Sequence, residues 1–362
     1  MPYGQRILAW SGSGFPADRF VAVGGVRLPE EPDLGWLQDR LNAAVRRHPV
    51  LGTGPVPLVN VDDVWASAAA ASYPPGSPCL LWAYVNGSDL LLVAHHTVSD
   101  PWSMRILVGD VLAGDRTSAR SYRHDVSVKH LKRMFRAVPF WKHTLVDVPP
   151  LTADGGSGMP ETTRELRIRT DITAVQADEV GRAARSTAFV VLFAAFAQAL
   201  QPLSAGRDLL IPVLTYGRDR SEWDTVGLYM NVLPVRLTTT DLPAVQHAFI
   251  AAYAQEIPFP VLLETLPTAG AAFARGGPAL AQFEVIQVQA DDSIEPLTIP
   301  AGLDLGGPIL PVNGLAFWLE LGSGGIYTVC LRYRNDLYRE SVMRALIQRF
   351  VDRWGDLYAA AS

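Results

Sequence analysis

The chain has little that would support metal, redox or disulfide chemistry. Its 362 residues include only two cysteines, Cys79 and Cys330, which lie far apart in apolar stretches. We therefore expect both to be reduced core residues of a cytoplasmic protein. The patterns CxxC, HExxH, GxxxxGK[ST] and GxSxG are absent. The zinc-ribbon, zincin, P-loop and α/β-hydrolase classes thus lose their usual sequence support.

Long apolar runs and an excess of positive charge are also lacking. No apolar run reaches the roughly 18–20 residues that a membrane-spanning helix needs. The first residues, MPYGQRILAW, do not have the charged-then-apolar order of a signal peptide. The formal net charge is −5, whereas nucleic-acid-binding domains favour a basic face. We therefore expect neither a membrane nor a nucleic acid as a partner.

The length and composition are sufficient for two lobes with cores of their own, since 49% of the residues are hydrophobic and 19% are charged. Strand-like and helix-like runs mix without a strict βαβ alternation, which favours mixed α/β lobes over a Rossmann or barrel fold. Residues 147–163 are rich in Gly, Pro, Ser and Thr, so we predict a linker there. It would join an N-terminal lobe at 1–146 to a C-terminal lobe at 164–362, with a site in the cleft between them.

Periodicity predicts the main elements. The runs CLLWAYV and LLLVAHH are β-rich, and the NGSD between them is typical of a hairpin turn. Residues 186–200 are apolar almost all round, which predicts a buried helix. Further helices are expected over 34–49, 103–112 and 128–145 and at the C-terminus, and further strands over 20–28, 164–171, 208–217 and 227–237.

Two adjacent histidines, His95 and His96, end the second run of the hairpin, and Asp100 follows four residues after His96. Three interpretations of this pattern are open. The first is a structural pair at a strand end. The second is a metal site, although adjacent strand residues point to opposite faces and are poorly placed to share one ion. The third is acid–base catalysis, because a neutral imidazole can take a proton from an incoming nucleophile.

The letters around the pair decide between these interpretations. HHTVSDPWSMRIL resembles the HHxxxDG signature of the condensation domains of nonribosomal peptide synthetases, which are members of the CoA-dependent acyltransferase superfamily. VRRHPVLGT resembles the family's RHExLRT motif, and PFWKHTL its YWxxxL helix end. VLTYGRDRSEWDTVGLYMNVLPVRL is similar to the GR and VGxFxNTLPxR motifs. The motifs occur in family order along essentially the whole chain, which is identified as a freestanding condensation domain.

The resemblance implies a fold and a reaction. The fold would be α/β, with two chloramphenicol-acetyltransferase-like subdomains in a V-shaped pseudo-dimer and the active site at their interface. The reaction would join an acyl thioester, carried on the phosphopantetheine arm of an acyl or peptidyl carrier protein, to an amine or hydroxyl acceptor. A small molecule could serve as acceptor. Acyl-CoA as donor, and a noncatalytic domain that recruits a partner, are the alternatives. No intrinsic cofactor or metal is implied, and we expect a monomer.

The resemblance also implies roles for single residues. His96 would be the catalytic base, His95 would pack structurally, and Asp100 would form a salt bridge to an arginine, for which Arg47 is the best candidate. The other candidates are assigned to the substrate or its tunnel, with structural support as the competing interpretation for several of them. They are Ser99, Pro101, Trp102, Asn231 and Arg236.

Two departures from the family pattern bear on activity. Gly52 replaces the second arginine of RHExLRT, and Pro101 replaces the glycine of HHxxxDG. Proline fixes φ, removes an N–H donor and adds bulk where a pantetheine arm would pass. A narrowed tunnel and a loss of activity are both open consequences, although the presence of His96 and Asp100 favours a working site.

Overall fold

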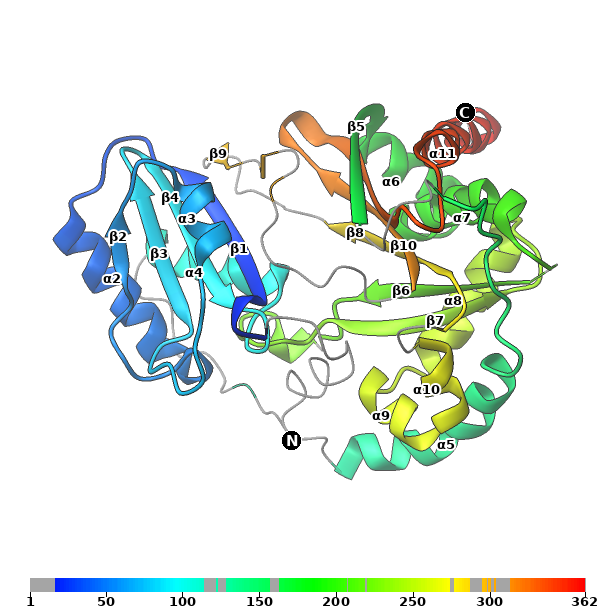
Figure 1. Ribbon diagram of the computed structural model, residues 1–362, viewed down its shortest axis with the longest axis horizontal. Coiled ribbons are helices and arrows are strands. Elements are labelled where there is room, and N and C mark those ends of the chain that lie inside the picture. The colour runs from blue at the N-terminus through cyan, green and yellow to red at the C-terminus, as the bar shows by residue number, and fades with distance from the viewer. Residues whose placement is uncertain are drawn as a thin grey trace. The chain divides into compact units, whose positions relative to one another are not determined.

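The computed structural model describes residues 17–113, 122, 128–156, 163–206, 208–218, 220–273, 277–286, 295–297, 299–300, 303 and 313–361. Contacts divide the chain into two compact units (Figure 1). The first unit comprises Met1–Asp125, Tyr216–Met230 and Val288–Pro308, and the second comprises Val126–Thr215, Asn231–Gln287 and Ile309–Ser362. These units are not the continuous ranges 1–146 and 164–362 expected from the sequence, because residues 126–146 belong to the second unit and two later segments of the chain belong to the first.

The first unit is built on a five-stranded sheet in the order β2-β3-β4-β1-β9. Its strands are β1 (Val21–Arg27), β2 (Leu58–Asn60), β3 (Leu81–Asn86), β4 (Asp89–His95) and β9 (Glu295–Pro296). β3 and β4 form the predicted antiparallel hairpin, with Asn86 opposite Asp89. β1 pairs antiparallel with β4, so that Val21 lies beside His95. The strand that ends in the histidine pair is therefore held from both sides.

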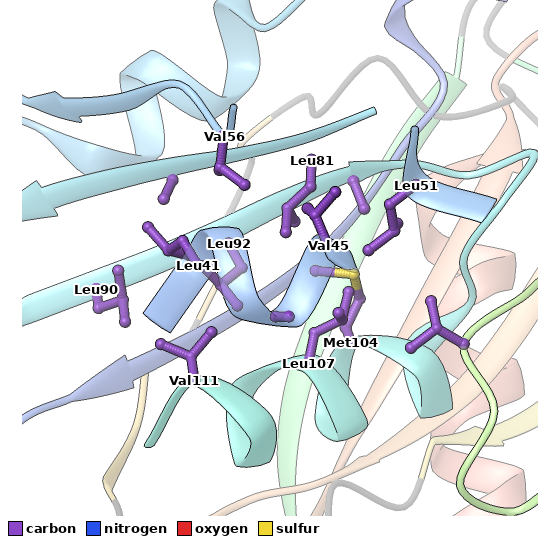
Figure 2. Packing of buried hydrophobic residues seen from close by; sticks show 14 of the residues in the cluster. Leu41, Val45, Leu51, Val56, Leu81, Leu90, Leu92, Met104, Leu107 and Val111 are labelled. Carbon is purple, nitrogen blue, oxygen red and sulfur yellow. The ribbon is translucent and has the colours of Figure 1, made fainter. Parts of the chain in front are cut away.

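Helices cover both faces of this sheet. They are α2 (Leu34–Arg47), α3 (Val64–Ala70) and α4 (Pro101–Ala113), with short 3-10 turns η1 (Ala17–Arg19), η2 (Pro49–Leu51) and η4 (Arg220–Glu222). Along β4, Leu90 and Leu92 belong to the core formed with α2 and α4 (Figure 2). Leu91 and Val93 belong to the second core, which includes residues of α3. Successive strand residues face opposite sides of a sheet, so β4 is buried on both.

The second unit is built on a six-stranded sheet in the order β5-β11-β10-β8-β6-β7. β8 pairs parallel with both β10 and β6, and the other neighbours are antiparallel. The strands are β5 (Thr163–Thr173), β6 (Leu209–Thr215), β7 (Asn231–Leu237), β8 (Leu280–Ile286), β10 (Gly314–Leu321) and β11 (Ile326–Arg334).

The core of the second unit is aromatic and is centred on α7 (Ala188–Leu200). Phe196 of this helix lies 5.1 Å, centroid to centroid, from Phe283 of β8 and 4.6 Å from Phe317 of β10. Phe317 in turn contacts Phe350 of α11 (Glu340–Ala361) at 5.0 Å. The remaining elements of this unit are α5 (Val128–Thr144), α6 (Ala174–Ala183), η3 (Gln201–Leu203), α8 (Leu242–Ala254), α9 (Phe259–Thr265), α10 (Pro267–Phe273) and η5 (Ser323–Gly325).

The mixed α/β architecture with two sheets confirms the fold class expected from the sequence. Cys79 and Cys330 are both buried and unpaired, as expected. In the part of the chain that the structure describes, no single helix is long and apolar enough to cross a membrane. One bent pair, Ala174–Ala183 with Ala188–Leu203, passes that test by length and composition alone, and α7 within it is buried in the core.

Candidate functional site

His95 is the last residue of β4 and packs inward. Only 8% of its surface is exposed, and its ring meets the rings of Tyr73 and Phe20 edge-on. The Nδ1 atom lies 2.6 Å from the Thr97 hydroxyl and also accepts the Thr97 N–H at 3.2 Å. Because Nδ1 accepts, the proton of the neutral ring is on Nε2. These contacts pack His95 into the interior of the first unit.

His96 follows directly and has different surroundings. Its backbone N–H donates to the Phe20 carbonyl at 2.8 Å, and its ring stacks on the Phe20 ring with the centroids 4.4 Å apart. The side chain is half-buried. Nδ1 is buried and forms no hydrogen bond of standard geometry with any described residue. Nε2 is therefore the nitrogen that a substrate can reach.

Burial lowers the pKa of His96 below its ordinary value of 6.5, because the charged imidazolium is poorly solvated there. The backbone of His96 and of Ser99 and the negative charge of Asp100 act in the opposite direction without overcoming burial. The imidazole is consequently neutral at about pH 7 and able to accept a proton.

Asp100 is a fully buried carboxylate that binds three donors of the first unit. Its Oδ1 accepts from Arg218 Nη2 at 2.8 Å and from the Ser103 N–H at 2.7 Å. Its Oδ2 accepts from the Tyr229 N–H at 2.9 Å. The side chains of Asp100 and Arg218 are only 2% and 1% exposed. A buried charge is tolerated when it is paired and hydrogen-bonded in this way.

Arg218 joins the loop before β7 to the start of α4. Its Nη2 also donates to the Ser103 hydroxyl at 2.7 Å, and Nη1 donates to the carbonyls of Glu222 and Thr225. The guanidinium lies 4.2 Å from the centre of the Tyr229 ring. Arg218 therefore acts as a clamp that holds a distant segment of the chain against the histidine loop.

The backbone at Gly227 completes this clamp. Ser103 Oγ donates to the Gly227 carbonyl at 2.7 Å and accepts the Gly227 N–H at 3.0 Å. A Cβ atom at Gly227 would lie 2.3 Å from the Tyr122 ring. Tyr122 in turn donates to the Leu228 carbonyl at 2.5 Å. Only glycine leaves room for this ring, which explains the residue type at this position.

The expected pair of Arg47 and Asp100 is wrong, because each residue has another partner. Arg47, on α2, lies 3.4 Å from Asp110 Oδ1, and His48 Nε2 lies 2.7 Å from Asp110 Oδ2. Asp110 is ten residues beyond Asp100, about 15 Å farther along α4 at 1.5 Å per residue. Arg47 therefore supports the packing of α2 on α4, and Arg218 takes the expected role beside Asp100.

Pro101 is the first residue of α4, two residues before the predicted start. Asp100 is the N-cap of this helix: its carbonyl accepts the Met104 N–H at 3.0 Å, and its side chain accepts the Ser103 N–H. The N–H of the first helical residue has no partner within a helix, so a proline there loses nothing. The departure from the HHxxxDG pattern thus suits the local backbone.

The two neighbouring candidates, Ser99 and Trp102, are placed differently. Ser99 is fully buried and donates to the His95 carbonyl at 3.0 Å, so it supports the loop. Trp102 is half-buried, donates from Nε1 to the Trp223 carbonyl at 2.9 Å and lies beside the rings of Trp223 and Tyr216. Trp102 therefore belongs to an aromatic group at the surface of the first unit.

Asn231 and Arg236 lie on β7, in the second unit. The Asn231 amide donates to Glu256 Oε1 and to the Ile257 carbonyl, both at 3.0 Å, and its oxygen accepts the Phe259 N–H. Arg236 donates to Asp208 at 3.0 Å and to backbone carbonyls at the end of α5. The polar groups of both side chains thus bind protein atoms within their own unit, which supports the structural interpretation.

The sequence interpretation gave no role to Ser103 or Tyr229, and it included Arg218 only as part of the stretch similar to the GR motif. The signal for Arg218 was its GR motif, and the signal for Ser103 was its place three residues after the N-cap. Among the described residues, no group of three or more His, Cys, Asp or Glu side chains could hold a metal ion.

Comparison with known proteins identifies the family of this chain. The family model described as "Condensation domain" matches residues 80–357. The chain belongs to the condensation domain family. CymA of Salinispora arenicola, whose name describes a nonribosomal peptide synthetase, is 28% identical over an alignment that covers 76% of this chain. The Fusarin C synthetase of Gibberella moniliformis is 26% identical over 73% of this chain. The chain spans only 4% and 7% of the lengths of these two synthetases.

Solved structures show the same fold. SgcC5 from Streptomyces globisporus superposes with a TM-score of 0.77 at 20% identity, over 99% of this chain and 98% of its own. The X-domain from teicoplanin biosynthesis, solved in complex with OxyB, superposes with a TM-score of 0.71 at 18% identity, over 98% of this chain and 92% of its own. The condensation domain fold is thus present across nearly the whole chain.

Proposed function

We propose that this condensation domain catalyses acyl transfer from a carrier-bound thioester to an amine or hydroxyl acceptor, with His96 as the proton acceptor. One observation carries the proposal. The His96 imidazole is held neutral by burial, has one reachable nitrogen and stands beside a clamped loop. A group of this kind is suited to take a proton near neutral pH.

The proposed reaction forms one bond and breaks one. The acceptor nitrogen or oxygen attacks the thioester carbonyl carbon, the carbon–sulfur bond breaks, and the phosphopantetheine thiol leaves. The proton of the acceptor passes to His96 Nε2 and then to the departing thiolate. A hydroxyl acceptor needs this base more than an amine does, because an α-amine has a pKa of about 7.7–8.0 and is partly neutral without help.

Asp100 is not a relay partner in this proposal. Its two oxygens accept from Arg218, Ser103 and Tyr229, and the structure records no hydrogen bond between it and His96 in the described chain. It contributes by holding the start of α4, and through it the loop that follows His96. It is a positioning residue, and Arg218 and Ser103 act through it.

The test measures product formation by intact-mass spectrometry, with acyl- and aminoacyl-loaded carrier proteins as donors. Wild type should form product, and His96→Ala should lose about 10²–10⁴-fold in rate, the usual contribution of a general base. His95→Ala is not a clean comparison, since that side chain packs in the core. Arg353→Ala, an exposed change on α11, serves as the matched control and should keep the wild-type rate.

The same experiment separates the alternatives. Turnover with acyl-CoA but with no loaded carrier protein would favour a CoA-dependent acyltransferase. Carrier binding without turnover from any donor would favour a recruiting domain, which the likeness to the fold of the X-domain keeps in consideration. Equal rates for wild type and a folded His96→Ala variant would exclude the base role.

A further inference from the structure

The orientation of the His96 ring is not fixed by a hydrogen bond. In many histidine bases a group bound to the second ring nitrogen sets the tautomer and orients the ring. Here Nδ1 is buried and makes no hydrogen bond of standard geometry within the described chain. The oxygens of the neighbouring carboxylate, Asp100, accept from other donors. Rotation about the bond between Cβ and Cγ of histidine is soft, so another contact must hold the ring.

Phe20 lies directly opposite His96 in the sheet. β1 and β4 are antiparallel with Val21 beside His95, and one further step in the same register pairs Phe20 with His96. The His96 N–H donates to the Phe20 carbonyl at 2.8 Å, which agrees with this pairing. Side chains of directly opposed residues lie close together on one face of a sheet. The phenyl and imidazole rings accordingly stack, with their centroids 4.4 Å apart and their planes 13° from parallel.

The Phe20 ring is itself held in place. Only 6% of the residue is exposed, and its ring also meets the His95 ring at right angles, with the centroids 6.5 Å apart. The chain before Phe20 is tied to the segment that precedes β3. The Asp18 carbonyl accepts the Tyr73 N–H, and the Asp18 carboxylate accepts the Ser72 hydroxyl, both at 2.7 Å. All of these residues belong to the first unit, so Phe20 offers the imidazole a fixed plane.

A stacked ring can hold a base without blocking it. The lone pair that accepts a proton lies in the plane of the imidazole, so a ring that covers one face leaves Nε2 able to accept. Rotation of the imidazole out of the stacked plane would drive its edge into the phenyl ring, which close packing resists. A carboxylate bound at Nδ1 would also fix the ring, but its negative charge would raise the pKa of the imidazole. The stack fixes the orientation without adding charge.

We propose that Phe20 is a positioning residue for His96. Its ring fixes the plane of the imidazole and thereby the direction in which Nε2 accepts the proton of the incoming amine or hydroxyl. In this role Phe20 acts only through His96. In its consequence for the reaction the inference rests on the proposed function, whereas the orientation of the ring can be measured without any substrate.

The competing interpretation is that Phe20 only fills space in the core. In that case a branched apolar side chain could replace the phenyl ring at a modest cost in stability, and turnover would not change. Positioning requires a flat ring instead. Phe20→Leu removes the flat ring and keeps an apolar side chain, whereas Phe20→Tyr keeps the ring. These two variants therefore separate the interpretations.

Kinetics with loaded carrier proteins as donors measure the consequence for the reaction. Phe20→Leu should lower kcat by about 10–100-fold, since a misplacement of about 1 Å can cost about 100-fold. KM should stay near the wild-type value, because the change removes no substrate contact. Phe20→Tyr should keep the wild-type kcat. Tyr84→Leu is the matched control, because Tyr84 is a buried aromatic residue of β3 whose ring packs beside Trp82; it should lower stability and leave kcat unchanged.

A double variant separates the orientation of His96 from a general disturbance of the site. His96→Ala removes the imidazole, so the Phe20 ring has nothing left to orient. In that background Phe20→Leu should change the remaining rate by less than about twofold, although the same change costs about 10–100-fold in the presence of His96. Equal losses in both backgrounds would overturn the inference, because the effect would then not pass through His96.

Nuclear magnetic resonance measures the orientation itself. The histidine rings are labelled with ¹³C, and the His96 signals are identified by their absence in His96→Ala. In wild type the stacked phenyl ring should shift the His96 ring hydrogens upfield and keep the order parameter of the ring C–H bonds at about 0.85. In Phe20→Leu the upfield shift should disappear and the order parameter should fall below about 0.6. Phe20→Tyr and Tyr84→Leu should keep both wild-type values.

Unchanged His96 signals in Phe20→Leu, or the lack of an upfield shift in wild type, would overturn the inference. If circular dichroism shows that Phe20→Leu does not fold, Phe20→Met replaces it as a flexible apolar side chain without a ring. Failure of the proposed function looks different: His96→Ala keeps the wild-type rate, or no donor gives product. In either case the His96 signals still decide whether Phe20 orients the ring.

Discussion

Replacing Asp100 with alanine should destabilise the first unit strongly. The change removes the carboxylate that Arg218, Ser103 and Tyr229 share and leaves the Arg218 guanidinium buried without its counter-ion. Breaking a buried pair from one side costs about 3–5 kcal/mol. Loss of the N-cap of α4 adds about 1 kcal/mol. The sum, about 4–6 kcal/mol, equals the lower end of the free energy of unfolding of an ordinary domain, about 5–15 kcal/mol.

A second variant separates the two contributions. Asp100→Asn keeps an oxygen that can accept the Ser103 N–H, so the cap survives while the ion pair is lost. It should therefore be less destabilising than Asp100→Ala by about 1 kcal/mol. Arg218→Met leaves the Asp100 carboxylate with two backbone donors but no counter-ion. In the double variant Asp100→Asn/Arg218→Met no charge stays buried, so its loss should be at least about 2 kcal/mol smaller than the sum of the single losses.

The assay is urea unfolding followed by tryptophan fluorescence and by circular dichroism. Two probes are needed because a chain with two compact units need not unfold in one step. Asp356→Ala, which removes an exposed ion pair with Arg353, is the control and should cost less than about 1 kcal/mol. The reasoning would be refuted if Asp100→Ala lowered the free energy of unfolding by less than about 1 kcal/mol. It would also be refuted if the double variant lost as much free energy of unfolding as the two single variants together.

Four further outcomes are expected. With a hydroxyl acceptor, which does not titrate near neutral pH, turnover should fall only below pH 6.5, since burial lowers the pKa of His96 and the base must be neutral; an inflection above 6.5 in the pH profile of kcat/KM for that acceptor would contradict this. Wild type should lose about 3 kcal/mol more free energy of unfolding than Glu284→Gln as the pH rises from 4.5 to about 7, because burial in the folded state raises the pKa of Glu284 on β8 to about 7; equal pH dependence of the two proteins in urea unfolding would count against it. Pro101→Gly should cost about 1 kcal/mol in thermal unfolding and leave turnover near wild type; a faster enzyme would show that the proline obstructs the site. Gly227→Ala should cost about 1–3 kcal/mol through its clash with Tyr122, and an added Tyr122→Leu change that recovers nothing would exclude that clash as the cause.

The elements that were predicted well depend on local signals. The NGSD turn and its two flanking apolar runs are next to one another in sequence, and the hairpin of β3 and β4 follows them closely. The residues of α7 are apolar on almost every side of the helix, and this alone predicted a buried helix without knowledge of its packing partners. In both cases a short stretch of sequence is sufficient to predict the element, because its hydrophobic pattern shows which of its residues are buried.

The partner of Asp100 depends on tertiary structure instead. Arg218 is 118 residues away, and no local pattern connects a loop before β7 with the first turn of α4. Arg47 was the chosen candidate because it stands in VRRHPVLGT, the stretch that resembles the RHExLRT motif of the family. The actual packing of α2 on α4 brings Arg47 to Asp110. Asp110 lies about 15 Å farther along α4 than Asp100. Residue type and motif identify which charges need partners, but the fold selects the partner.

The boundaries of the compact units also depend on tertiary structure and could not be predicted from local patterns. Composition identified residues 147–163 as a break, yet the described part of this segment is tied into the second unit, where Leu151 donates to the Ala279 carbonyl and Thr152 to that of Leu203. Conversely, Tyr216–Met230 joins the first unit although it follows a strand of the second. A segment leaves one core and joins another because of contacts between residues that are far apart in sequence, such as those of Arg218.

The arrangement of hydrogen bonds bears on how His96 gains its basicity. In a relay, a carboxylate binds the imidazole and raises its pKa. Here the oxygens of Asp100 are taken by Arg218, Ser103 and Tyr229, and Arg218 neutralises much of the charge that would otherwise act on the ring. Burial therefore dominates, and the pKa of His96 falls. A weaker base that is fully neutral at pH 7 suits an acceptor that is itself partly deprotonated, and Brønsted behaviour makes it less effective with a hydroxyl. If the proposed function holds, this balance favours amine acceptors over alcohols, which a competition between an amine and its hydroxyl isostere would measure directly.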